Sequence, residues 1–397
     1  MEYFVEALRI PVLAQCNVAV AGGGIAGIAA ALSAARLGAD VVLIEREYLL
    51  GGLATLGLIA IYLPLCDGCG RQVSRGICDE LFWLSIRHGP AGRVPDKWLR
   101  PHSAAVRSKQ RMKVQYDPQL FALSAEKLLR EAGVRILYGS AVCAAPHNAG
   151  AVNALILENS AGRTALQAGA VVDATGDAVI CRLAGEQTAR CAQQSRLTAW
   201  YYSLFDGQNR LHILGESDER AALHEPAAAQ LDGEPFDGLD LWQLSAALGR
   251  SHEVQRRAFL AEGGVTDAHA LTTLPTLPQL RMTRRLVGAS QPGQSIANTP
   301  QADSVGLVAD WRKTGTVYEL PFGSLHAQVN HNLWAAGRCI SVQDDLWDVT
   351  RVIPAAAVTG EAVGIAAAAG ASAVQPTLQK RGIPLHIGEI MGEPSLE

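Results

Sequence analysis

Three glycines and one carboxylate have the spacing of a dinucleotide-binding turn. Gly22, Gly24 and Gly27 follow the pattern G-x-G-x-x-G, and Glu45 lies 21 residues after Gly24. In such a turn the first glycine permits a tight bend, the second lets a pyrophosphate approach the backbone, and the third lets a helix pack closely on a strand. The acid is placed to accept hydrogen bonds from a ribose diol. These residues predict a dinucleotide site and leave the kind of dinucleotide open.

The residues around this pattern predict the strand–helix–strand unit that must position it. Residues 18–21 form an apolar run typical of a buried parallel strand. An alanine-rich helix is expected over 25–37, ending near Gly38. The unpaired N–H groups at its N-terminus would point at phosphates. A second strand is expected over 40–44, directly before Glu45.

Further elements are expected along the whole chain. They are a helix opened by Asp117 and Pro118 and ending at Gly133, strands over 134–138 and 141–144, a hairpin formed by 154–158 and 165–166, a buried strand over 170–174, a polar and mostly helical stretch over 205–264, strands within 273–288 and over 317–320, a strand over 332–336 and a buried helix over 355–369. We therefore expect an α/β fold. Its Rossmann-like domain, with a parallel central sheet, would be discontinuous (1–60, 115–190 and 330–375). An inserted α+β substrate domain would comprise 61–114 and 191–329, and 376–397 would form a C-terminal tail.

Composition limits the classes of function. The chain has 397 residues, of which 49% are hydrophobic and 18% charged, and a formal net charge of −4. This charge excludes a strong electrostatic argument for binding nucleic acid or an anionic membrane surface. The apolar runs are broken by glycine (18–32), short (53–65) or interrupted by Glu361 (355–369), so we expect no membrane span. The acidic N-terminus lacks the pattern of a signal peptide, and we expect a cytoplasmic protein.

Several segments together resemble the FAD-dependent oxidoreductases of the glutathione-reductase-like two-domain class, in particular a bacterial family whose fingerprint is followed by a GG-x-x-T segment. The matching segments are 51–55 (GGLAT), 65–68 (LCDG), 70–73 (GRQV), 116–118 (YDP), 173–177 (DATGD), 280–281 (LR), 283–286 (TRRL), 336–341 (AGRCIS) and 351–354 (RVIP). They are spread over nearly the whole chain. The resemblance implies that the Rossmann-like domain binds FAD rather than NAD.

The resemblance also assigns cofactor contacts. Glu45 would hold the adenosine ribose, with Arg46 and Gly52 along the pyrophosphate and adenine side and the backbone of Val142 at the adenine. Gly176 and Asp177 would approach the cofactor from a second loop, and Gly337 and Arg338 would pass its ribityl tail. The N-terminus of the last helix, near Thr359, would face the flavin pyrimidine. The complete set of expected cofactor-binding residues is Gly22, Gly24, Ile25, Ala26, Gly27, Glu45, Arg46, Gly52, Thr55, Val142, Gly176, Asp177, Gly337, Arg338 and Thr359.

Three residues are candidates for catalysis because the resemblance brings their segments to the flavin ring. Arg351 would be an electrostatic partner of the flavin or of an anionic substrate, and the alternative is an ion pair with one of the aspartates at 344, 345 and 348. Arg281 is a similar candidate. Asp344 would serve as a base if burial raised its pKa.

Histidines offer a weaker case for acid or base catalysis. Several relatives have a histidine shortly after the segment that corresponds to 337–341, where this chain has Val342, Gln343, Asp344 and Asp345. This departure argues against histidine-assisted dehydrogenation at that position. His326 and His331 flank the returning strand, and we interpret them as surface or hydrogen-bonded residues rather than catalysts.

Cys66 and Cys69 form a C-x-x-C pattern, the spacing of a redox disulfide or of half a zinc site. Cys78 follows nine residues after Cys69, but a fourth zinc ligand is not evident from the sequence, so we expect no metal. A redox dithiol stays open as an alternative to an incidental cysteine at position 69.

The sequence therefore predicts an FAD-dependent oxidoreductase that transfers a hydride to or from a small organic substrate. One alternative is a flavin/dithiol disulfide oxidoreductase that uses Cys66 and Cys69, and another is a flavin-binding accessory subunit without catalysis of its own. Only one G-x-G-x-x-G pattern is present, so NAD(P)H would have to enter the substrate pocket, or electrons would pass to oxygen, a quinone or a protein carrier. A homodimer is one alternative for the oligomeric state.

Overall fold

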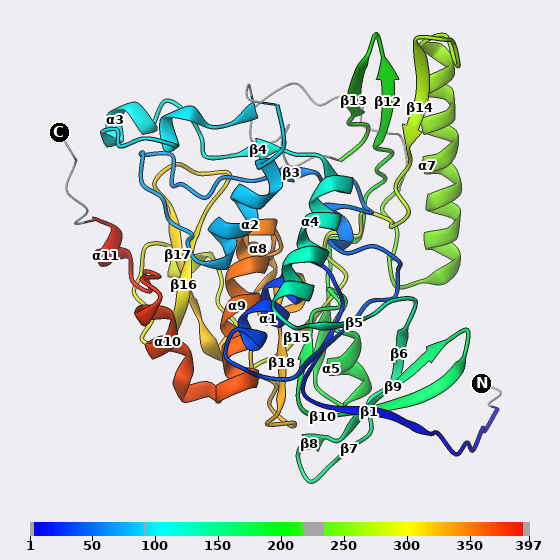
Figure 1. Cartoon of the computed structure of the whole chain (residues 1–397), viewed down its shortest axis with the longest axis vertical. Coiled ribbons are helices and arrows are strands. Elements are labelled where there is room, and N and C mark those ends of the chain that lie inside the picture. Colours follow the sequence, from blue (N-terminus) through cyan, green and yellow to red (C-terminus); the bar gives the residue numbers. More distant parts are fainter. Residues whose placement is uncertain (1–3, 91–92, 217–233, 392–397) are drawn as a thin grey trace.

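A mixed seven-stranded sheet forms the centre of the computed structural model, which describes residues 4–90, 93–216 and 234–391 (Figure 1). The strand order is β5 (Arg135–Leu137), β2 (Val41–Ile44), β1 (Val12–Ala21), β10 (Gly162–Asp173), β9 (Ala154–Asn159) and β6 (Ala141–Ala144), and β18 (Leu333–Ala335) pairs with β10. The pairs β5–β2, β2–β1, β1–β10 and β10–β18 are parallel. This arrangement confirms the α/β class with a parallel central sheet.

Strand β10 joins two elements that the sequence suggested as separate. Its first half pairs antiparallel with β9, from Gly162 opposite Asn159 to Gln167 opposite Ala154. Its second half pairs with β18, with Val171 opposite Leu333. The expected hairpin strand and the expected buried strand are therefore one strand of 12 residues. Strand β1 pairs with β10 from Ala165 to Asp173 and so keeps the backbone extended across the junction of the two expected strands.

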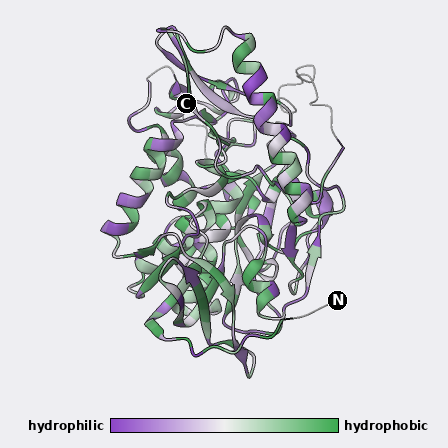
Figure 2. Ribbon diagram, turned by 90° about the vertical axis from the view of Figure 1, so that its right-hand side faces the viewer, coloured by the Kyte–Doolittle hydropathy of each residue, from purple (hydrophilic) through white to green (hydrophobic). Residues whose placement is uncertain are grey.

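The two faces of the sheet are covered by different layers, as the alternation of side chains along a strand requires. Val18 and Val20 of β1 belong to the larger core, together with α1 (Ile25–Ala35), α2 (Ile77–Ile86), α4 (Pro118–Glu131) and α9 (Ile353–Ala369). Ala19 and Ala21 belong to a second core on the other face, together with α5 (Val179–Leu183). Figure 2 shows the segments around the sheet as predominantly hydrophobic.

Helices α1 and α9 touch along their backbones. A Cβ atom at Gly360 would lie 2.3 Å from the carbonyl oxygen of Ala26, and one at Gly364 would lie 2.3 Å from that of Ala30. Only glycine therefore permits this packing distance. The contact places the middle of α9, at Gly360, against the start of α1, at Ala26. Helices α1 and α9 lie side by side in Figure 1.

The outer elements form smaller sheets and helices. Strands β12 (Tyr201–Phe205), β13 (Gln208–His212) and β14 (His269–Thr273) form an antiparallel sheet beside α7 (Leu241–Ala261), at the top of Figure 1. Four strand pairs complete the described sheets: β3 (Ile61–Tyr62) with β4 (Val114–Gln115), β7 (His147–Asn148) with β8 (Ala151–Val152), β11 (Thr188–Arg190) with β15 (Arg284–Leu286), and β16 (Ser304–Ala309) with β17 (Val317–Pro321). The remaining α-helices of the described residues are α3 (Ala104–Arg107), α8 (Asp344–Thr350), α10 (Val374–Lys380) and α11 (Ile387–Met391).

The sequence-based expectations for individual elements had mixed outcomes. The cap of α4 is confirmed, since Asp117 Oδ1 accepts a hydrogen bond from the backbone N–H of Leu120 at 2.8 Å. The helical expectation for 205–264 is right for α7 and wrong for β13, and residues 217–233 lie outside the described residues. The segment expected as a C-terminal tail contains most of α10 and all of α11.

No single helix in the described ranges is both long and apolar enough to cross a membrane. Helices α8 and α9 pass that test of length and composition only as a pair, with a bend of 89° between them.

Candidate functional site

The glycine-rich turn between β1 and α1 gives each of its three glycines a different task. Gly22 has a φ of +100°, and a Cβ atom there would lie 2.4 Å from the carbonyl oxygen of Ala174. A Cβ at Gly27 would lie 1.8 Å from the carbonyl oxygen of Gly22, so this glycine lets α1 pack on the turn. A Cβ at Gly24 would meet nothing within 4 Å. Gly24 is therefore the position at which the backbone faces open space.

Glu45 follows β2 directly and is 7% exposed. Its Oε2 accepts a hydrogen bond from the backbone N–H of Gly23 at 2.6 Å, and its Oε1 accepts one from that of Glu47 at 2.8 Å. Burial raises the pKa of Glu45 above its ordinary value, although these two hydrogen bonds act in the opposite direction. Each carboxylate oxygen can accept a further hydrogen bond, so the side chain keeps acceptor capacity for the hydroxyl groups of a ligand in the cavity.

A cavity of about 610 Å³ begins at these residues and continues past the ends of β10 and β18. It is lined by most of the predicted cofactor-binding residues: Gly22, Gly24, Ile25, Ala26, Glu45, Arg46, Gly52, Val142, Gly176, Asp177, Gly337 and Arg338. Arg281 and Arg351 also line it. Four predicted site residues do not: Gly27, Thr55, Thr359 and Asp344. Residues from five separate parts of the chain (22–52, 142, 176–177, 281 and 337–351) thus meet in one cavity.

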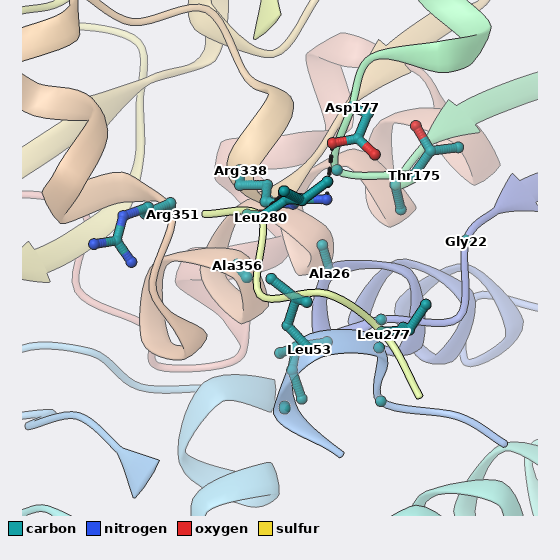
Figure 3. A pocket seen from close by; sticks show the side chains of 18 of the residues that line it. Gly22, Ala26, Leu53, Thr175, Asp177, Leu277, Leu280, Arg338, Arg351 and Ala356 are labelled. Carbon is teal, nitrogen blue, oxygen red and sulfur yellow. Dashed lines mark hydrogen bonds and ion pairs between the residues drawn. The ribbon is translucent and has the colours of Figure 1, made fainter. Parts of the chain in front are cut away.

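An ion pair crosses the middle of the cavity wall (Figure 3). Arg338 Nη2 lies 2.9 Å from Asp177 Oδ1. Arg338 also donates a hydrogen bond to the carbonyl oxygen of Leu280, and the hydroxyl of Thr283 donates one to Asp177 Oδ1 at 2.5 Å. A Cβ at Gly176 would lie 2.3 Å from Arg338 Nε. These contacts tie the turns after β10 and β18 to the segment before β15.

Thr55 and Thr359 support the cavity from behind its wall, which corrects the prediction that they contact the cofactor directly. The Thr55 hydroxyl donates a hydrogen bond to the carbonyl oxygen of Leu50 at 2.5 Å and so closes the turn that contains Gly52. Thr359 Oγ1 accepts a hydrogen bond from the backbone N–H of Gly337 at 3.0 Å. Helix α9 begins at Ile353 rather than near Thr359, and Ile353 and Ala356 line the cavity.

The three candidate catalytic residues have different surroundings. Arg351 lines the cavity and also forms an ion pair with Asp348, in which its Nε donates to Oδ1 at 3.0 Å. In Figure 3 it lies apart from the pair formed by Arg338 and Asp177. Asp344 pairs with Arg285 at 3.0 Å outside the cavity, so its predicted role as a base has no geometric support.

Arg281 is 5% exposed and lines the far part of the cavity. Its guanidinium carbon lies 5.8 Å from the centre of the Trp200 ring. Its Nη2 donates hydrogen bonds to Gln279 Oε1 at 3.2 Å and to the carbonyl oxygen of Glu216 at 3.1 Å. These contacts hold the guanidinium in one place at the cavity wall.

The C-x-x-C segment forms a turn around a buried carboxylate. Asp67 is completely buried, and its side chain accepts hydrogen bonds from the backbone N–H of Cys69 at 2.8 Å and from Arg71 Nε at 2.7 Å. Cys66 is buried, Cys69 is exposed, and neither lines the cavity. Within the described part of the chain no cysteine is in a disulfide, and no group of three His, Cys, Asp or Glu side chains could hold a metal ion.

The two candidate histidines lie together behind β18. His326 Nε2 is 3.3 Å from the carbonyl oxygen of His331, and neither residue lines the cavity. The ring of His326 is hydrogen-bonded and His331 is exposed, which matches the interpretation of the two as hydrogen-bonded or surface residues.

Sequence reasoning missed the side chains that close the cavity on the side away from Glu45. They are Trp200, Leu239, Leu241, Leu244, Leu248, Leu277, Pro278 and Leu280. The spacing of Leu241, Leu244 and Leu248 is that of one helix face and was the available signal. Only the folded structure shows which neighbour that face meets.

A comparison with protein families matches most of the chain. The sequence model of a family described as FAD dependent oxidoreductase matches residues 17–209 and 268–379. The stretch between the two matched parts contains the whole of α7.

Solved structures of low identity also match. They include the open conformation of a flavocytochrome c3 fumarate reductase (14% identity, 91% of this chain and 79% of that chain, TM-score 0.44). Two others are a 3-ketosteroid-Δ4-(5α)-dehydrogenase from Rhodococcus jostii RHA1 (16%, 92% and 100%, TM-score 0.38) and a geranylgeranyl bacteriochlorophyll reductase-like protein from Thermoplasma acidophilum (12%, 95% and 81%, TM-score 0.38). At these scores the likenesses carry no argument about this chain.

Proposed function

The chain belongs to the family of FAD dependent oxidoreductases, and we propose that it transfers a hydride between bound FAD and a small organic substrate held in the same cavity. The observation that carries this proposal is the continuity of the cavity. One space of about 610 Å³ is bounded at one end by the dinucleotide turn and Glu45 and at the other by Trp200, α7 and residues 277–281.

The residues present fit FAD. The turn exposes its backbone at Gly24, where a Cβ would meet no neighbour within 4 Å, so a pyrophosphate can approach closely. Glu45, a buried carboxylate at the cavity wall, would hold the ribose. Gly176 and Gly337 at the middle of the cavity, with φ values of +78° and +74°, would pass the ribityl chain.

When bound, FAD supplies two-electron chemistry by taking up or giving up a hydride. The protein's own residues orient the reactants. Helices α1 and α9 both begin at the cavity, and the positive ends of their dipoles favour negative charge there. Arg351 contributes a cation that its ion pair with Asp348 holds in place. The apolar side chains of α7 and of 277–280 exclude water from the far part of the cavity.

The electron partner follows from what the sequence contains. Only one G-x-G-x-x-G pattern is present, so we propose that NAD(P)H, if used, enters the cavity in place of the substrate. Otherwise electrons pass to oxygen, a quinone or a protein carrier. A cytoplasmic location belongs to the same proposal.

Anaerobic titration of the purified FAD-loaded protein with dithionite tests this function. We expect uptake of two electrons for each FAD, and Cys69→Ser should leave that number unchanged. Uptake of four electrons that falls to two in Cys69→Ser would instead identify a flavin/dithiol centre. Failure to bind FAD would refute the proposal. Failure of the reduced protein to pass electrons to oxygen, a quinone or NAD(P)⁺ would favour an accessory subunit.

A further inference from the structure

Residues 93–113 carry a concentration of positive charge that the cavity does not use. This segment contains seven arginines and lysines and one aspartate, a net charge of +6, whereas the rest of the chain carries −10. The structure describes all of these residues, and none of them lines the cavity. The positive charge therefore has no part in holding the cofactor or a substrate inside the cavity.

The segment folds into a small lobe, called the basic lobe below, that consists of η3 (Asp96–Trp98), α3 and the loops around them. The ring Nε1 of Trp98 donates a hydrogen bond to the carbonyl oxygen of Gln110 at 2.8 Å. The guanidinium carbon of Arg107 lies 5.3 Å from the centre of the same ring. The backbone N–H of Lys97 donates to Gln110 Oε1 at 3.0 Å. Because these contacts already order the lobe, a partner that binds it has few groups left to order.

Three cations of the basic lobe are exposed, namely Arg93, Arg100 and Lys109. Within the described ranges none of the three has an ion-pair partner. Leu99, next to Arg100, is 56% exposed and adds an apolar side chain to this charged surface. Protein interfaces combine apolar contacts with a charged and polar rim, so the basic lobe has the composition of a docking surface.

The basic lobe is joined directly to the wall of the cavity. Strand β4 follows it in the chain and pairs with β3, with Gln115 opposite Ile61. The backbone N–H of Leu65 also donates to the carbonyl oxygen of Met112 at 3.1 Å. Ile61 and Leu63 line the cavity, so the end of the lobe lies one strand spacing, about 5 Å, behind the cavity wall. Figure 1 shows α3 at the outer edge of the molecule.

An acidic protein fits the basic lobe better than other anions do. A small anionic substrate would need cations inside the cavity, and the lobe supplies none there. Nucleic acid and membranes present negative charge over an extended surface, which would also face the rest of the chain with its charge of −10. A compact acidic protein can cover the lobe alone. Interfaces of about 1,200 Å² or less are usual for redox proteins that bind one another briefly.

We propose that the basic lobe binds a small acidic electron-carrier protein, which exchanges electrons with FAD across the wall formed by β3 and β4. This inference rests on the proposed function and names the electron partner of the same site. Two reduced carriers each lose one electron, and FAD gains both electrons together with two protons from water. Oxidation of the reduced cofactor by two oxidised carriers is the reverse.

Isothermal titration calorimetry of the FAD-loaded protein with a plant-type ferredoxin, an acidic one-electron carrier, tests the docking without turnover. We expect binding at about 10 mM salt that weakens at least about tenfold at about 100 mM salt, because the Debye length falls from about 30 Å to about 10 Å. Failure to bind at low salt, or binding that salt does not weaken, would overturn the inference. Binding of duplex DNA or of anionic lipid vesicles in place of ferredoxin would also overturn it.

Charge reversal locates the binding. Arg100→Glu combined with Lys109→Glu should weaken ferredoxin binding at low salt about 10- to 100-fold. Arg100→Gln combined with Lys109→Gln should give a smaller loss. The matched control is Arg250→Glu combined with Lys380→Glu, which makes the same change of charge at exposed cations of α7 and α10. Equal losses in the lobe variant and the control would show that net charge alone matters and would overturn the inference.

Stopped-flow reduction by reduced ferredoxin adds a second readout. The second-order rate constant should fall in the lobe variant by about the same factor as the affinity, while reduction by dithionite stays unchanged. Circular dichroism and FAD content show whether each variant folds. A protein that takes up two electrons from dithionite but neither binds ferredoxin nor is reduced by it would refute this inference and leave the proposed function standing. A protein that binds ferredoxin through the basic lobe but takes up no electrons from dithionite would refute the proposed function alone.

Discussion

Replacing Gly24 by alanine should separate cofactor binding from folding. Gly24 has φ −70° and ψ −178°, a conformation that alanine adopts readily, and its added Cβ would meet no atom within 4 Å. Alanine lowers the conformational entropy of the unfolded chain and thereby stabilises the folded state by about 0.4–1 kcal/mol. Alanine is also a poorer N-cap than glycine, which costs about 1 kcal/mol. The apoprotein should therefore keep its free energy of unfolding to within about 1 kcal/mol. The new methyl group points into the space that a pyrophosphate needs, so the Kd for FAD should rise at least tenfold, or about 1.4 kcal/mol.

Gly27→Ala provides the contrast within the same turn. Its Cβ would lie 1.8 Å from the carbonyl oxygen of Gly22, so α1 must move, and overpacking of this kind costs about 1–3 kcal/mol. Urea unfolding of both apoproteins and fluorescence titration with FAD measure the two effects. The reasoning is refuted if Gly24→Ala binds FAD as tightly as the parent protein, or if Gly24→Ala loses more stability than Gly27→Ala.

Three further predictions concern residues around the cofactor. Burial raises the pKa of Glu45, so the Glu45 carboxyl group stays protonated to a higher pH in the folded apoprotein than in the unfolded chain. The free energy of unfolding therefore falls as the pH rises from the pKa of Glu45 in the unfolded chain to its pKa in the folded protein. Glu45→Gln should remove that slope in urea unfolding at a series of pH values, and an unchanged slope would contradict the assignment. Arg338→Met removes the partner of Asp177 at 2.9 Å and should cost about 1–2 kcal/mol, because both side chains are partly exposed. A double-mutant cycle with Asp177→Asn measures the coupling, and a coupling near zero would argue against the pair. Thr359→Val leaves the backbone N–H of Gly337 without its acceptor and should cost about 1–3 kcal/mol in chemical unfolding, whereas Thr359→Ser should retain most of the stability. Equal losses in both Thr359 variants would show that the hydroxyl is not the cause.

The cofactor half of the site was accessible from sequence because its determinants are local. The turn needs glycine at fixed spacing for steric reasons, and the carboxylate must follow the next strand directly, so Gly22, Gly24 and Glu45 could be named before the fold was known. The roles of Thr55 and Thr359 were placed wrongly, because a hydroxyl that supports a turn and one that contacts a ligand have the same sequence signature.

The substrate half was not accessible in the same way. Leu244 and Leu248 lie about 200 residues after Glu45, and a helix face of leucines is equally typical of an ordinary core. Asp344 was selected because the resemblance brings its segment to the flavin ring, whereas in the structure its side chain pairs with Arg285 outside the cavity. The merging of two expected strands into β10 has a similar cause, since pairing with β1 decides where the strand ends.

A crystal structure of the protein with FAD tests the central claim most directly, namely that one cavity holds the cofactor at Glu45 and the substrate at α7. The account predicts that the ribose hydroxyls of the adenosine half hydrogen-bond to the Glu45 carboxylate, and that the flavin ring faces Arg281 and Leu248. A flavin ring directed away from α7, or an adenosine ribose without contact to Glu45, would contradict it.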